Sequence, residues 1–124
     1  MAGTPDHPIT ITPNPNRVKV TFGGKVVANT TRALSLKEAS YAPVAYIPRA
    51  DVDMSLLKRT AHSTHCPYKG DASYYSIRAG DKLAENAIWS YEQPFPAMAE
   101  ISGRLAFYPN RVDAIEDAIE EELI

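Results

Sequence analysis

The chain has 124 residues, of which 44% are hydrophobic and 23% are charged, which is typical of one globular domain and excludes a chain that is disordered throughout. Its formal net charge of −2 conceals a split, because residues 113–124 carry six acids and no base, whereas residues 1–112 carry nine acids and thirteen bases. A body with a net charge of +4 and no dense basic patch can favour a small anion but not a phosphate backbone, so we expect no nucleic-acid partner.

Proline dominates the beginning of the chain. Four of the ten prolines fall within residues 1–15, where they remove backbone donors and favour extended conformations. The sequence therefore predicts a flexible N-terminal arm over residues 1–16, followed by a single β-rich domain over residues 17–124.

The first regular element is predicted to be a hairpin over residues 17–30. In RVKVTF, Val18, Val20 and Phe22 alternate with polar residues, and the following GG suits a two-residue turn with positive φ. A further strand, ALSLKEA, has Leu34 and Leu36 on one face, and Glu38 is the next residue in that register. An inward carboxylate at this position must be hydrogen-bonded, paired with a cation or protonated. The other interpretation is that the strand ends before it and the carboxylate reaches water.

A short helix and a second hairpin come next. Asp51 can cap one or two helical turns in ADVDMSLL. The segments DASYYSIRA and KLAENAIWSYE are rich in aromatic and β-branched residues and are separated by GD, so we expect them to pair.

The end of the chain shows a helical period. Val112, Ile115, Ile119 and Leu123 recur at intervals of three or four residues, and Asp113 stands near the start of this pattern. Together these segments predict a mainly β (α+β) fold. We expect a single compact domain of antiparallel hairpins in a curved sheet or partly open barrel, with one short internal helix and an acidic C-terminal helix.

The segment THCPYKGDASYY gathers reactive residue types. A zinc site needs three or four ligands, usually from two places in the chain, but His62, His65 and Cys66 form one cluster only, so we expect no metal and no cofactor. Cys66 can act as a nucleophile with His65 as a neighbouring base. The other interpretation is that Cys66 is a small apolar filler.

The same segment can form a binding pocket. Lys69 can hold an anion beside Gly70, whose missing Cβ lets the backbone approach, and Tyr74 can stack on a ring. The alternative is that Gly70 forms a turn and Lys69 is solvated. The leading hypothesis is a pocket for a small anionic or aromatic metabolite, completed by residues from other segments: Glu38, Arg49, His62, Trp89 and Tyr91.

Several segments, in order, resemble one known family. RVKVTFGGKVVANTTRAL, AYIPRADV, THCPYKGDASYYSI, ENAIWSYEQPFP and ISGRLAFYPNRVD are similar to the bacterial and fungal family called domain of unknown function 427. The resemblance covers about residues 17–113 and implies a single compact, mainly β domain. It leaves the function open.

Two function classes stand beside ligand binding. One is a small enzyme that uses Cys66 as a nucleophile or His62 and His65 as acid–base groups. The other is a self-associating module, such as a homodimer formed through an exposed strand edge or an aromatic patch. No apolar run approaches the ~20 residues that span a bilayer, and the first residues lack a secretion signal, so we expect a cytoplasmic protein with no membrane partner.

Overall fold

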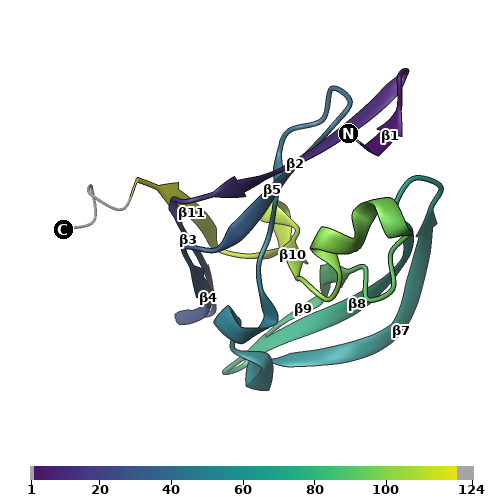
Figure 1. Ribbon diagram of the computed structural model, residues 1–124. Coiled ribbons are helices and arrows are strands. Elements are labelled where there is room, and N and C mark those ends of the chain that lie inside the picture. Colours follow the sequence, from purple (N-terminus) through teal and green to yellow (C-terminus); the bar gives the residue numbers. More distant parts are fainter. Residues whose placement is uncertain (1, 120–124) are drawn as a thin grey trace.

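Three antiparallel β-sheets make up the fold (Figure 1). A computed structural model describes residues 2–119 of the chain. The first sheet has the strand order β1-β2-β5-β6, with β1 (Ala2–Thr4), β2 (His7–Asn14), β5 (Ala33–Glu38) and β6 (Val44–Tyr46). The second sheet has the order β11-β3-β4, with β3 (Arg17–Phe22), β4 (Lys25–Thr30) and β11 (Ala114–Ala118). The third sheet has the order β10-β9-β8-β7, with β7 (Leu57–Cys66), β8 (Gly70–Ala79), β9 (Lys82–Ser90) and β10 (Ala106–Phe107).

The helices within residues 2–119 are short 3-10 segments. They are η1 (Arg49–Asp51), η2 (Met54–Leu56), η3 (Pro96–Ile101) and η4 (Pro109–Arg111). None of the helices in this range is long and apolar enough to cross a membrane. The prediction of a mainly β fold built from antiparallel strands is therefore confirmed, but the sheets do not form a barrel.

Both predicted hairpins are present. β3 pairs with β4 around Gly23 and Gly24, whose φ angles are 58° and 79°. The apolar residues of β3 are buried at every second position, as the alternation predicts. β8 pairs with β9 around Gly80, which has a φ of 63°. Local signals, namely alternation and glycine turns, were sufficient to identify these pairs.

The N-terminal segment belongs to a sheet rather than to a flexible arm. β2 pairs with β5 from Ile9 opposite Glu38 to Asn14 opposite Ala33, and Ile9 is fully buried. The alternating ITIT favours a strand in spite of the neighbouring prolines. Because β1 pairs only with the first residues of β2, the remainder of β2 has one uncovered edge within residues 2–119, where Pro13 need not remove a ladder hydrogen bond.

The prediction of a C-terminal helix is wrong within the described residues. Residues 114–118 form β11, which pairs with β3 so that Ile115 lies opposite Val20. Asp113 does not begin a helix. Its Oδ2 instead accepts a hydrogen bond from the backbone N–H of Gly23, in the turn between β3 and β4, at 2.9 Å. The edge of β3 that faces away from β4 offers backbone hydrogen-bond partners to β11. The helical spacing of the apolar residues near the C-terminus gives no sign of this pairing. The rest of the predicted helix, residues 120–124, lies outside the described residues.

The predicted internal helix is two separate 3-10 turns, η1 and η2, and its cap is misplaced. The side chain of Asp53, not that of Asp51, caps η2 by accepting from the backbone N–H of Ser55 at 3.1 Å. Asp51 instead accepts from the hydroxyl of Thr30 at 2.6 Å and from Nη2 of Arg32 at 2.9 Å.

Two hydrophobic clusters join the sheets. The first cluster connects the second and third sheets, and Val20, Ile77 and Ile88 are fully buried in it. The second cluster connects the first sheet to β8, β9 and η3, with Ile9 and Met98 fully buried. Figure 1 shows η3, drawn in green, in the space between β5 above and β8 below. The candidate site lies at the polar edge of this second cluster.

Candidate functional site

A cavity of about 210 Å³ lies where the first and third sheets face each other. Two charged residues line it: Glu38, at the end of β5, and Lys69, in the turn between β7 and β8. The rest of the lining is largely aromatic, with Tyr41, Tyr46, Tyr74, Trp89, Tyr91 and Tyr108. Five of the predicted site residues therefore border one cavity: Glu38, Lys69, Tyr74, Trp89 and Tyr91.

Glu38 is held between two basic side chains. β5 continues through Glu38, and only 18% of its side chain is exposed, so the carboxylate does not simply extend into water. Its Oε2 lies 2.7 Å from Nε2 of His7, and its Oε1 accepts a hydrogen bond from Nζ of Lys69. Burial raises the pKa of this carboxyl, but the hydrogen bonds from His7 and Lys69 outweigh burial and the net pKa lies below the usual glutamate value. Glu38 is consequently ionised at neutral pH.

Lys69 is a buried lysine, with 8% of its side chain exposed. The backbone fixes it, because its N–H donates to the carbonyl of Cys66 at 3.3 Å and its carbonyl accepts from the N–H of Phe95 at 3.0 Å. Its Nζ also lies 5.9 Å from the centroid of the Tyr91 ring, within the range of a cation–π contact. The ion pair with Glu38 uses one of its three N–H bonds, and within residues 2–119 the other two have no hydrogen-bond partner and can serve a ligand.

Gly70 has a structural role beside this lysine. Its φ is +113°, and a Cβ added there would lie 3.4 Å from Cα of Pro94 and 3.5 Å from N of Phe95. These are ordinary contact distances, so it is the positive φ rather than the close approach that requires glycine in the turn that holds Lys69. Gly70 does not line the cavity, so it acts on the site through the position of the turn.

The aromatic wall is connected by hydrogen bonds and ring contacts. Nε1 of Trp89 donates to the hydroxyl of Tyr46 at 3.0 Å, and its ring lies 4.5 Å from that of Tyr108. The hydroxyls of Tyr108 and Tyr74 are 3.4 Å apart. Burial raises the pKa of Tyr46 and Tyr91, and burial together with the bond to Tyr74 raises that of Tyr108 to about 12. These hydroxyls therefore stay protonated at neutral pH.

Tyr91 differs from its neighbours in one respect. Its side chain is buried and borders the cavity, yet its hydroxyl has no hydrogen-bond partner within residues 2–119. A protonated, unpartnered hydroxyl at a cavity wall is a donor that a ligand can use.

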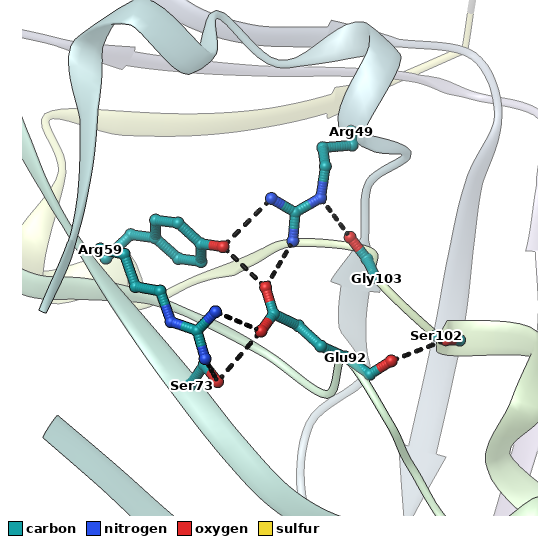
Figure 2. A network of polar contacts seen from close by, with 7 residues as sticks. Arg49, Arg59, Ser73, Glu92, Ser102 and Gly103 are labelled. Carbon is teal, nitrogen blue, oxygen red and sulfur yellow. Dashed lines mark hydrogen bonds and ion pairs between the residues drawn. The ribbon is translucent and has the colours of Figure 1, made fainter. Parts of the chain in front are cut away.

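Arg49, which the sequence predicts for the pocket, belongs to a separate network (Figure 2). Its Nη2 donates to Oε2 of Glu92 at 3.1 Å and its Nη1 to the hydroxyl of Tyr75 at 3.1 Å. Its Nε donates to the carbonyl of Gly103 at 3.1 Å. Arg49, the first residue of η1, therefore fastens this turn to the third sheet and to the turn after η3.

Glu92 is the centre of this network, and the sequence did not identify it. It accepts from Tyr75 at 2.8 Å, from Nη1 of Arg59 at 2.8 Å and from Ser73 at 3.3 Å, in addition to Arg49. Burial raises its pKa, but the bond from Tyr75 and the two arginines prevail and the net pKa is lowered. Both carboxylate oxygens are satisfied by the protein, which indicates a structural clamp.

His62, His65 and Cys66 make separate contacts within the described residues. His65 is exposed and pairs with Asp71, with Nδ1 and Oδ1 2.7 Å apart. His62 is exposed and contacts the edge of the Tyr74 ring at 4.4 Å. Cys66 is half-buried against the second cluster, and no hydrogen bond links its thiol to either histidine in the described part of the chain. Among residues 2–119 no three His, Cys, Asp or Glu side chains are grouped to hold a metal ion.

A larger hollow lies elsewhere. It measures about 740 Å³ along β7, β8 and β9, and His62, Lys58, Arg78 and Glu85 line it as exposed side chains. We place the candidate site at the smaller cavity, because a charged pair and six aromatic side chains line it together.

Sequence reasoning missed His7, Tyr41 and Tyr108. His7 was assigned to the arm, although its alternation with Ile9 in HPITIT places both on one face of a strand. Its ring stacks on Tyr68, with centroids 4.0 Å apart and planes at 10°. Tyr41 and Tyr108 lie in connecting segments, where no periodic signal marks a site residue.

Comparison with known proteins agrees with the resemblance seen in the sequence. The family model described as "Domain of unknown function (DUF427)" matches residues 10–118. No curated protein matches the chain. Because the model covers nearly all of the described strands, from within β2 to the end of β11, the chain belongs to the DUF427 family.

Proposed function

We propose that the protein binds a small aromatic acid in the cavity between the first and third sheets. The observation that supports this most is a convergence: Glu38 from β5, Lys69 from the β7–β8 turn and Trp89 from β9 border the same cavity. Charged and aromatic groups from distant segments that meet in a concave site are typical of small-molecule binding sites.

The size of the cavity favours a ligand with a single ring. A volume of about 210 Å³ corresponds to roughly seven water-sized volumes and lies below the range of cavities that hold drug-sized molecules. A nucleotide would not fit inside it. A ring that contacts the aromatic wall would gain stacking or edge contacts with Trp89 and Tyr108.

The polar groups favour an acceptor oxygen on that ring. Lys69 has two N–H bonds left after its pairing with Glu38, and the hydroxyl of Tyr91 is an unpartnered donor in the described part of the chain. The positive charge of Lys69 offsets the negative charge of Glu38, so this ion pair does not present a net negative charge to a carboxylate. Charge-assisted hydrogen bonds from Lys69 would give the carboxylate a fixed orientation.

A panel of single-ring acids, such as benzoate and its hydroxy derivatives, tests the proposal by thermal shift and calorimetry. We expect binding that weakens about tenfold or more in Lys69→Met and about fivefold in Tyr91→Phe, because these changes remove a charged and a neutral donor. Lys82→Met and Tyr68→Phe are matched controls, since Lys82 is exposed and neither residue borders the cavity. Absence of stabilisation by every acid on the panel, or equal affinity in Lys69→Met and Lys82→Met, would contradict the proposal.

A further inference from the structure

A second cavity, of about 320 Å³, lies between the first and second sheets. Its lining is mainly aliphatic and aromatic, and it includes Val18, Val20, Ile47, Phe107 and Ile115. Val18, Val20 and Ile47 are almost completely buried, so they form the floor of the cavity beneath its more exposed lining residues. Two of its polar side chains, Asn14 and Asp117, bond to each other at 3.0 Å. This cavity therefore offers apolar contact and little that would bind a charge.

The two cavities are neighbours that share a wall. Val44 and Trp89 line both of them. Adjacent residues in the chain face opposite cavities, since Tyr108 lines the first and Pro109 the second. One layer of side chains thus separates a polar, aromatic chamber from an apolar one.

A ligand that occupied both cavities would have to pass the side chains of Val44 and Trp89. Val44 begins β6, which is an edge strand paired only with β5, so the backbone beside this wall is held from one side. Trp89 is only partly buried, and the interactions of its side chain with Tyr46 and Tyr108 lie on the side of the first cavity. A movement of the Val44 side chain breaks no strand ladder, whereas a movement of the Trp89 ring would break its hydrogen bond with Tyr46.

We propose that the two cavities together bind an amphipathic ligand, an aromatic acid that carries an aliphatic chain. The acid group and ring occupy the first cavity, beside Lys69 and Tyr91, and the chain passes Val44 and Trp89 into the second. This inference rests on the proposed function and specifies its ligand class. The second cavity corresponds to roughly ten water-sized volumes, which sets the longest chain that it can hold at a similar number of methylene groups.

A series of 4-alkylbenzoates with increasing chain length tests the inference on the unaltered protein by calorimetry. Each methylene buried in the second cavity is expected to raise the affinity about fourfold, until the cavity is filled and the gain stops. Ala45→Leu is designed to fill the second cavity, because Ala45 lines it and does not line the first. It should abolish the gain with chain length and leave the affinity for benzoate unchanged, whereas Ala61→Leu, at an exposed position of β7, should change neither.

The outcomes separate this inference from the proposed function. Binding of benzoate with no gain along the series would overturn the inference and leave the proposed function intact. A gain that persists in Ala45→Leu would also overturn it, because the chain would then lie outside the second cavity. If neither benzoate nor its alkyl derivatives bind, both proposals fail. Unchanged benzoate affinity in Ala45→Leu also verifies that this variant is folded.

Discussion

Glu38→Gln should destabilise the fold by removing the negative charge that faces a buried lysine. The substitution keeps the size and shape of the side chain, so the effect on packing is small. The side chain of Lys69 is 8% exposed and that of Glu38 is 18% exposed, so water cannot fully replace the lost carboxylate.

The loss of stability expected for Glu38→Gln lies between two known limits. Removal of one partner from a fully buried ion pair costs about 3–5 kcal/mol, and removal of an exposed pair costs less than about 1 kcal/mol. For a pair that is largely but not fully buried, we expect a loss of about 2–3 kcal/mol in the free energy of unfolding. Lys69→Met should cost a similar amount. The double variant should lose less than the sum of the two single losses by about 1–2 kcal/mol, because the second change removes a group that already lacks its partner.

Urea unfolding at pH 7 measures these losses, which should appear as shifts of about 1 M or more in the midpoint for each single variant. Asp71→Asn is the matched control, because the pair of Asp71 and His65 is 79% and 62% exposed and should contribute less than about 0.5 kcal/mol. Additive losses in the double variant, or single losses no larger than that of Asp71→Asn, would refute the reasoning.

Three further predictions concern the surroundings of the site. Glu92→Gln should reduce the free energy of unfolding by about 1–2 kcal/mol, because two arginines lose their shared carboxylate at a partly exposed position. Glu85→Gln, at an exposed position, should have almost no effect. Equal stability of the two variants would contradict the structural role of Glu92. Since the pKa of Glu92 is lowered in the folded protein, its stabilisation is complete above the ordinary glutamate pKa of about 4.3 and is lost as the pH falls through the lower folded value. The difference in stability between the native protein and Glu92→Gln should therefore shrink below about pH 4. A difference that grows on acidification would show that folding raises the pKa of Glu92 instead of lowering it. Gly70→Ala should cost about 2–3 kcal/mol and Gly24→Ala about 1 kcal/mol, because the φ of +113° at Gly70 lies well outside the left-handed region that a side chain tolerates, whereas the φ of +79° at Gly24 lies close to it. A thermal midpoint lowered equally in both variants would contradict this reasoning.

The sequence predicted those parts of the fold whose signals are local. The β3–β4 and β8–β9 hairpins each combine alternating residues with a glycine turn, and both signals lie within a few residues of each other. The register of Leu36 and Glu38 also follows from alternation alone, and it led to the expectation that an inward carboxylate requires a partner.

The remaining features depend on pairings between distant residues. Lys69 is 31 residues from its partner Glu38, and nothing near either residue specifies the other. β11 is a strand because it lies along β3, not because of its own period. Arg49 was assigned to the pocket by residue type, but Glu92, which is 43 residues away, draws it into a different network. Tertiary context decided each of these cases.

The emission of Trp89 during titration with benzoate tests the central claim most directly. Trp89 is the only tryptophan in the chain and lines the candidate cavity and its apolar neighbour, so its emission reports on these two adjoining cavities and on no other part of the protein. The account predicts a saturable change in emission for the native protein and a curve displaced to about tenfold higher concentration for Lys69→Met. An emission that does not respond to benzoate, or a curve that is identical in Lys69→Met, would contradict it.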